Sequence, residues 1–308
     1  METQAIYRDI AKRCGGDVYI GVVGPVRTGK STFIKRFMET LVIPNITSEF
    51  ARERATDELP QSAAGRTIMT TEPKFIPEEA VKISLDDSAT LNVRMIDCVG
   101  YIVPSSLGYI ENEQPRMVVT PWFDKEIPFN LAAEIGTQKV INEHSTIGLV
   151  VTTDGSISDI PREEYEEAEQ RVVNELRQIN KPFVVLLNCT NPSAPAAVSL
   201  RASLEERYGV PVVAVNCLDL GEADIRVILS DVLFQFPVRE VAVSLPGWVT
   251  SLAPDHWLRA SLYDSIRQSA QDVERIGQLK SKITTLSECE YVSRVLVDNI
   301  DLGHGGAS

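Results

Sequence analysis

Long apolar segments are missing from this sequence of 308 residues, and positive charge is scarce. No run approaches the roughly 18 apolar residues of a membrane-spanning helix, and the N-terminal segment lacks the apolar core of a secretory signal peptide. Lys and Arg number 30 against 43 Asp and Glu, and the formal net charge of −13 disfavours binding to a nucleic-acid backbone. We therefore expect a protein that binds no nucleic acid and meets membranes only peripherally.

Cysteine and histidine are also few. The five cysteines show no C-x-x-C spacing, and the three histidines are too dispersed to indicate a metal site. An odd, scattered set of cysteines in a chain of this length favours reduced thiols and a cytoplasmic location. The hydrophobic content of 44% and the charged content of 24% are typical of a globular protein with a substantial core.

Short apolar segments rich in β-branched residues alternate with helical patterns along most of the chain. The segments that read as strands buried on both faces are 18–23, 91–96, 147–151, 183–187 and 210–215. The patterns that predict helices are 31–41, 163–179 and 198–208. Strands that alternate with helices indicate an α/β fold with a doubly wound, mostly parallel sheet.

This alternation stops near Pro237. A strand-like run follows at 238–245, and a helical pattern covers about 257–280. We therefore predict a first domain over residues 1–237 and the beginning of a small α+β middle domain over residues 238–308.

The segment between the first strand and the first helix reads GPVRTGKST and has the G-x-x-x-x-G-K-S/T pattern of a P-loop. Glycines allow successive N–H groups to turn toward an anion, and the helix N-terminus adds positive potential. We expect Lys30 to reach the β- and γ-phosphates and Ser31 to bind Mg²⁺. The predicted nucleotide-binding residues of the loop are Gly24, Pro25, Val26, Arg27, Thr28, Gly29, Lys30, Ser31 and Thr32.

A second motif, Asp97-Cys98-Val99-Gly100, follows the strand at 91–96 and has the D-x-x-G pattern of switch II in GTPase-like P-loop proteins. Asp97 is predicted to hold Mg²⁺, directly or through water, and the N–H of Gly100 to approach the γ-phosphate. Ras-like proteins continue with a Gln that orients the attacking water, whereas Tyr101 follows here.

Several groups could assist hydrolysis in place of that Gln, and the sequence leaves them open. Arg27, Arg66 and Lys74 could act within the chain, or a neighbouring subunit could supply the group. The last arrangement would tie hydrolysis to assembly.

Switch I is expected at 57–73, between the first helix and the second strand. Such a loop offers a threonine that completes the Mg²⁺ shell and senses the γ-phosphate. Thr67, Thr70 and Thr71 are the candidates, and Thr70 and Thr71 stand just before the strand-like residues 74–76. The predicted metal-binding set is therefore Ser31, Thr70 and Asp97.

The base-recognition motif of GTPases is degenerate. The strand at 183–187 is followed by Asn188-Cys189-Thr190-Asn191, where GTPases carry N-K-x-D. Asn188 is present, but the Lys and the Asp are not. An amide lacks the negative charge that favours the two N–H donors of guanine. The sequence therefore predicts ATP, or a site that discriminates poorly, with Asn188 among the nucleotide contacts.

Longer blocks accompany these motifs, among them DELPQSAAG at 57–65, MTTEPKF at 69–75 and EHSTIG at 143–148. Through them the chain resembles the stage IV sporulation protein A family, the morphogenetic ATPases of endospore-forming bacteria, over essentially its whole length. The resemblance implies an ATPase with a GTPase-like P-loop fold. It also implies that Lys30 binds phosphate, that Asp97 is linked to Mg²⁺, and that Thr70 and Thr71 are sensors.

The resemblance further implies that hydrolysis drives self-polymerisation into the basement layer of the spore coat. The expected place is the mother-cell cytoplasm, peripherally on the outer forespore surface. Expected partners are further copies of the chain, other coat morphogenetic proteins and a small amphipathic membrane peptide, the last through a C-terminal region beyond this sequence. Two alternatives stay open, namely a regulatory GTPase-like switch with relaxed base specificity and a nucleotide-binding scaffold without turnover.

Overall fold

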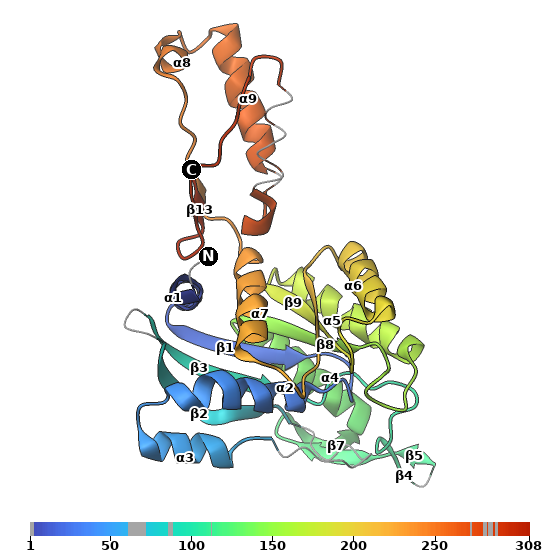
Figure 1. Ribbon diagram of the computed structural model, residues 1–308. Coiled ribbons are helices and arrows are strands. Elements are labelled where there is room, and N and C mark those ends of the chain that lie inside the picture. Colours follow the sequence, from blue (N-terminus) through green and yellow to red (C-terminus); the bar gives the residue numbers. More distant parts are fainter. Residues whose placement is uncertain are drawn as a thin grey trace. The chain divides into compact units, whose positions relative to one another are not determined.

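The computed structural model describes residues 3–60, 72–85, 89–111, 113–271, 273–279, 282, 286 and 289–308. The chain divides into two compact units, Met1–Val232 and Leu233–Ser308 (Figure 1). The α-helices that begin in the first unit are α1 (Thr3–Arg13), α2 (Lys30–Phe37), α3 (Glu49–Asp57), α4 (Phe129–Lys139), α5 (Glu166–Gln178), α6 (Pro195–Tyr208) and α7 (Glu222–Phe234). Its strands are β1 (Asp17–Val23), β2 (Lys74–Leu85), β3 (Ala89–Asp97), β4 (Ile110–Glu111), β5 (Gln114–Pro115), β6 (Met117–Thr120), β7 (Phe123–Pro128), β8 (Ile147–Thr153), β9 (Phe183–Asn188) and β10 (Val212–Val215).

The central sheet has six strands in the order β10-β9-β8-β1-β3-β2. All neighbours are parallel except β2, which runs antiparallel to β3. In Figure 1, α2 and α7 lie in front of the sheet, and α4 and α5 lie behind it. The predicted α/β fold with a doubly wound, mostly parallel sheet is confirmed.

Burial explains why these segments form the sheet. Every residue of β8 and β9 is buried, as expected for central strands covered by helices on both faces. On one face, Val23 of β1 and Val150 of β8 belong to a hydrophobic core with Val172 and Leu176 of α5. Continuous apolar strands of this kind read clearly from sequence.

The strand order indicates the edge of the sheet at which a ligand would bind. β1 is flanked by β3 on one side and by β8 on the other, so the later strands of the chain are added to the sheet on both sides of β1. In open α/β sheets, ligands bind at the carboxyl ends of the strands where the order reverses in this way. The turn after β1 and the ends of β3, β8 and β9 meet at this edge.

Several elements differ from the sequence prediction. β2 extends from Lys74 to Leu85 rather than over 74–76, with an irregular register between Ile76 and Val81. Pro77, Glu78 and Glu79 interrupt its apolar pattern, which concealed the rest of the strand. The hairpins β4–β5 and β6–β7 and the helices α3 and α4 were not predicted. A π-helical turn, Met38–Val42, continues α2.

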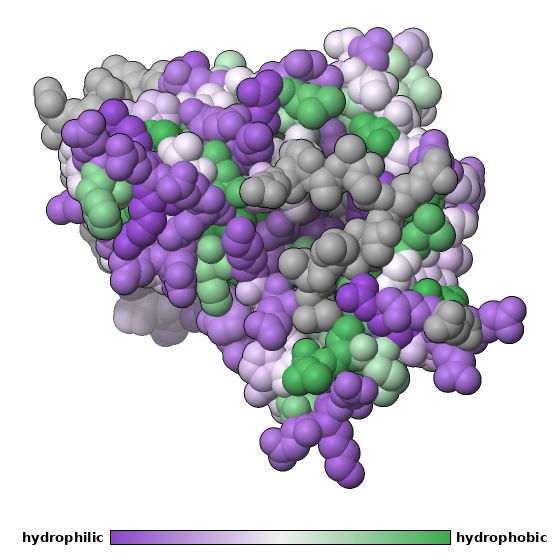
Figure 2. All heavy atoms as spheres, turned by 90° about the horizontal axis from the view of Figure 1, so that it is seen from below, coloured by the Kyte–Doolittle hydropathy of each residue, from purple (hydrophilic) through white to green (hydrophobic). Residues whose placement is uncertain are grey.

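The hydrophilic surface of the molecule agrees with its content of charged residues. Figure 2 shows a mostly hydrophilic face with separate apolar groups. Hairpin β6–β7 exposes Met117, Val119 and Phe123 to 48%, 69% and 44%. Within the described part of the chain, no helix is both long and apolar enough to cross a membrane.

The second unit is small and contains both helices and strands. Its elements are β11 (Glu240–Val241), α8 (Gly247–Ser251), α9 (Trp257–Gln271), β12 (Ile300–Asp301) and β13 (Gly306–Ala307), and the strands form a sheet in the order β11-β13-β12. β11 is much shorter than the predicted run 238–245, in which Val243 is 47% exposed. α9 ends at Gln271, before the predicted residue 280. Beyond it, the backbone of residues 274–276 bonds to residues 236–238 instead: the N–H of Ile276 donates to Phe236 O, and the N–H of Val238 donates to Glu274 O.

Candidate nucleotide-binding site

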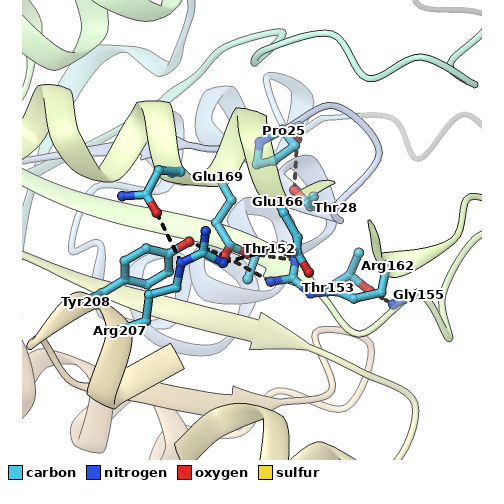
Figure 3. A network of polar contacts seen from close by, with 11 residues as sticks. Pro25, Thr28, Thr152, Thr153, Gly155, Arg162, Glu166, Glu169, Arg207 and Tyr208 are labelled. Atoms are coloured by element: carbon cyan, nitrogen blue, oxygen red, sulfur yellow. Dashed lines mark hydrogen bonds and ion pairs between the residues drawn. The ribbon is translucent and has the colours of Figure 1, made fainter. Parts of the chain in front are cut away.

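The loop between β1 and α2 has the geometry of an anion-binding nest. Gly24 and Gly29 adopt positive φ angles of 136° and 90°, and α2 begins directly at Lys30. The hydroxyl of Thr28, which is fully buried, donates to Pro25 O at 3.0 Å and braces the loop from within (Figure 3). The N-terminal N–H groups of α2 therefore point into a preformed turn, the arrangement that binds phosphate.

Lys30 lies over this loop. It is only 5% exposed, and its Nζ donates to Pro25 O at 2.6 Å and to Gly24 O at 3.5 Å. Burial lowers the pKa of Lys30, and the neighbouring Cys98 and Asp97 oppose that effect only in part. Backbone carbonyls thus hold the ammonium group, and phosphate oxygens would be stronger acceptors for it.

Asp97 ends β3, beside the end of β1, where it pairs with Val22 in the register of the sheet. Its Oδ2 accepts a hydrogen bond of 2.6 Å from the Ser31 hydroxyl. Its Oδ1 is buried and forms no hydrogen bond with the residues that the structure describes. Burial raises the pKa of Asp97, against the Ser31 hydrogen bond and the charge of Lys30.

An unpaired carboxylate oxygen next to a hydroxyl fits Mg²⁺. This ion takes oxygen ligands and is commonly bound through one or two protein groups together with substrate phosphates. A nearby cation would also compensate the buried charge of Asp97. Ser31 and Asp97 are therefore the described residues that could hold it. Thr67, Thr70 and Thr71 lie outside the described residues, as does Arg66.

Gly100 brings switch II against the P-loop. Its φ is 91°, and a Cβ atom there would lie 2.1 Å from Gly24 O and 2.7 Å from the Nζ of Lys30. Only glycine allows this approach, which places the backbone of Gly100 beside the Nζ of Lys30. Two further hydrogen bonds join the segments, from Tyr101 N to Gly24 O at 3.3 Å and from Val26 N to Tyr101 O at 2.9 Å.

The side chain of Tyr101 is held on α5. It is buried, and its hydroxyl lies 2.5 Å from Oε2 of Glu175. The guanidinium of Arg171 lies 4.3 Å from the centroid of its ring. Burial, together with Glu175, raises the pKa of Tyr101. The residue after Gly100 therefore anchors switch II to a helix.

Asn188, at the end of β9, connects two backbone segments. Its Nδ2 donates to Thr28 O at 3.0 Å, and its Oδ1 accepts from Cys217 N at 3.1 Å. In the structure, this amide stabilises the P-loop from the β9 side, and its predicted contact with nucleotide stays a prediction. Asn191 stands where GTPases carry the aspartate, and its Oδ1 accepts from Ser193 N at 3.1 Å.

A buried polar network near the loop was missed by the sequence analysis (Figure 3). Glu169 of α5 is fully buried and accepts hydrogen bonds from Nη1 and Nη2 of Arg162 at 2.7 and 2.9 Å. The hydroxyl of Tyr208 donates to Glu169 at 2.6 Å, and Nη1 of Arg162 also donates to Thr152 at 3.1 Å. Burial acts to lower the pKa of Arg162, but Glu169 outweighs it and raises the pKa.

This network fixes the turn that links β8 to α5. The turn lies close to the P-loop, because a Cβ atom on Gly29 would be 3.8 Å from Cδ1 of Ile157. A sequence signal did exist, since Glu169 shares a helical face with the buried Val172, Val173 and Leu176. A charged residue on an apolar face predicts a buried partner.

The parallel sheet and the P-loop, with the aspartate and glycine of switch II beside it, define a P-loop NTPase domain. Residues 1–237 match the family model "Stage IV sporulation protein A, ATPase domain", and residues 238–308 match the model of the middle domain of the same protein. The chain belongs to the stage IV sporulation protein A family.

Three curated relatives bear that name. Those of Bacillus anthracis and Bacillus subtilis (strain 168) are 53% and 50% identical over 307 residues, which is 100% of this chain and 62% of each relative. That of Clostridioides difficile (strain 630) is 50% identical over 300 residues, 97% of this chain and 61% of the relative. The chain thus spans less than two thirds of the length of these relatives.

Proposed function

We propose that the chain binds Mg²⁺-ATP at residues 24–32 and hydrolyses it, and that hydrolysis drives self-assembly of the whole protein into the basement layer of the spore coat. The observation that carries the enzymatic part is the placement of Lys30 and Asp97. The buried ammonium of Lys30 lies over the nest, and a buried carboxylate oxygen of Asp97 has no hydrogen-bond partner among the residues that the structure describes. Both groups are costly to bury without a charged ligand, and Mg²⁺-ATP supplies both partners.

Each group of the site has a part in this reaction. The N–H groups of the loop and the Nζ of Lys30 bind the β- and γ-phosphates, and the N–H of Gly100 approaches the γ-phosphate. Ser31 and Asp97 would hold Mg²⁺, with Thr70 or Thr71 as a further ligand. When bound, Mg²⁺ neutralises charge that develops on the phosphate oxygens. Exclusion of water from the nest strengthens each of these interactions.

ATP is favoured over GTP because the base-reading aspartate is replaced. Asn191 carries no charge, and its side-chain oxygen already accepts a backbone hydrogen bond. Guanine would lose two charge-assisted hydrogen bonds, whereas adenine does not require them. Asn188 remains the proposed contact on the base side.

Assembly and its partners belong to the longer protein. The relatives' names refer to sporulation, which supports a role in that process. The proposed place is the mother cell, on the outer forespore surface. The proposed partners are further copies of the chain, other coat morphogenetic proteins and a small amphipathic membrane peptide, while nucleic acid is not among them. Centrifugation of the protein with ATP, and with a non-hydrolysable analogue, tests assembly, and pelleting that requires hydrolysis is the expected result.

Phosphate release from ATP and from GTP tests the enzymatic part. We expect faster release from ATP and its loss in Lys30→Ala. Loss of hydrogen bonds to a charged group, at about 2–3 kcal/mol, corresponds to binding weaker by roughly 30- to 150-fold. Lys35→Ala is the matched control, because Lys35 lies on the same helix and pairs with Glu39 at 3.9 Å on the surface.

The two alternatives give different results. The anchoring of Tyr101 on α5 favours a scaffold without turnover, which predicts ATP binding with no phosphate release. A GTPase-like switch predicts faster release from GTP. Equal ATP binding by Lys30→Ala and the parent chain would contradict the assignment of the loop.

A further inference from the structure

Arg27 occupies a backbone position that suits glycine. Its φ is 62°, in the left-handed region, within the nest between Gly24 and Gly29. This conformation costs a residue with a Cβ atom about 1–2 kcal/mol, and it costs glycine little. Strained residues of this kind are concentrated at active sites, ligand-binding sites and switch regions.

Its neighbours in the loop face the interior. Val26 is 2% exposed and packs in the hydrophobic core, and Thr28 is fully buried with its hydroxyl on Pro25 O. Arg27 is only partly buried. Lys30 and Arg27 are therefore the two cationic side chains that the loop presents.

The charge of Arg27 acts on a tyrosine in the connection that follows β8. Burial raises the pKa of the Tyr165 hydroxyl, and both the hydrogen bond with Ser158 and the charge of Arg27 oppose this. Tyr165 directly precedes α5, in the connection that follows β8, whereas Asp97 ends β3 on the other side of β1. The charge of Arg27 thus acts on the connection that follows β8, whereas the proposed Mg²⁺ ligand Asp97 belongs to β3.

The other candidates are placed less favourably. The hydroxyl of Tyr101 is bound by Glu175 on α5. Lys74 pairs with Asp97 in the register of β2 and β3, and its charge acts on that carboxylate. Arg66 lies outside the described residues.

We propose that Arg27 is a catalytic residue that binds the γ-phosphate and the β–γ bridging oxygen of ATP in the transition state, within its own chain. This inference rests on the proposed ATPase function. The water oxygen forms a bond to the γ-phosphorus, and the bond from that phosphorus to the bridging oxygen breaks, with its electron pair left on ADP. The protons of the water pass to the phosphate product and to solvent. Arg27 stays protonated throughout and contributes hydrogen bonds and charge.

The test compares two glycine substitutions. Arg27→Gly and Glu113→Gly each place glycine at a position with a left-handed backbone conformation. Glu113, in the turn between β4 and β5, has a φ of 65°. Both variants should unfold at the same or a higher denaturant concentration than the parent chain. Only Arg27→Gly should lose kcat for ATP, by about 100-fold or more, with KM within a few-fold, because arginine groups in such sites are worth about 10³ or more. Arg27→Lys should regain part of the loss.

Mixing experiments separate action within the chain from action between chains. Lys30→Ala retains Arg27, so if Arg27 acted on a neighbour's site, a mixture of Lys30→Ala with Arg27→Gly would recover turnover. No recovery is expected, and recovery would overturn the inference.

Arg27→Gly with kcat within twofold of an active parent chain would also overturn the role of Arg27, while leaving the ATPase proposal intact. A parent chain that releases no phosphate from ATP would instead overturn both together.

Discussion

The buried pair Arg162–Glu169 provides a quantitative test of the packing around the site. Glu169→Gln preserves the shape of the side chain and removes its charge. The side chain of Arg162 is 13% exposed, and its Nε is already buried without a hydrogen-bond acceptor in the described structure. The substitution therefore removes the hydrogen-bonded counter-charge of a buried cation and weakens the acceptor for the Tyr208 hydroxyl.

The expected loss is about 3–5 kcal/mol, the range for breaking a buried ion pair by changing one partner. For a unit of this size, about 2–4 °C per kcal/mol converts this loss to a fall in Tm of roughly 6–20 °C. Thermal and urea unfolding, followed by circular dichroism, measure both quantities. Glu166→Gln is the control, because Glu166 is 48% exposed and pairs with Arg207 at 3.5 Å. It should cost less than about 1 kcal/mol.

A second variant separates charge from packing. Replacing both partners, as in Arg162→Leu with Glu169→Leu, removes the unpaired charge and should be less destabilising than Glu169→Gln alone. If Glu169→Gln costs no more than Glu166→Gln, the pair does not stabilise the turn after β8, and the reasoning fails.

Two further substitutions test other parts of the first unit. Tyr101→Phe should lower stability by about 1 kcal/mol through the lost hydrogen bond to Glu175, with phosphate release within twofold of the parent chain. A tenfold loss of release at unchanged stability would instead place the hydroxyl in the chemistry. Burial, with help from Glu205, raises the pKa of Asp231 to about 6 from an ordinary 3.8, so the folded state binds more protons between these values and stability falls as pH rises through them. Asp231→Asn should therefore be more stable than the parent by about 1 kcal/mol at pH 7, after allowance for solvent screening, and the advantage should vanish near pH 4 in urea titrations. An advantage that does not change with pH would contradict this origin.

The sequence predicted the parallel strands because each is almost continuously apolar. It also placed Lys30, Asp97 and Gly100 together, since motifs at the carboxyl ends of neighbouring parallel strands must meet. β2 was mostly missed because it is an edge strand with Pro77, Glu78 and Glu79 in its interior. The extent of β11 was overestimated because an exposed β-branched run has few partners to pair with.

Side-chain roles were harder to predict than positions. The structure shows Asn188 bound to two backbone segments and Tyr101 turned onto α5, and both arrangements depend on contacts more than 25 residues away along the chain. The ion pair of Glu169 was overlooked because a charged residue on an apolar helical face indicates a buried partner without identifying it. Tertiary contacts decide such cases, and local pattern does not contain them.

The hydrogen bonds of Tyr101 with Gly24 and Val26 extend the pairing of β1 and β3 past the ends of both strands. The same residue is fastened to Glu175, whose neighbour Arg171 also binds Glu134 of α4 at 2.8 Å. A ligand that displaces Gly100 therefore acts on the same connection as a partner that contacts α4 and α5 at the surface. Where such a connection couples two binding events, thermodynamic reciprocity requires that each alter the other's affinity by the same factor.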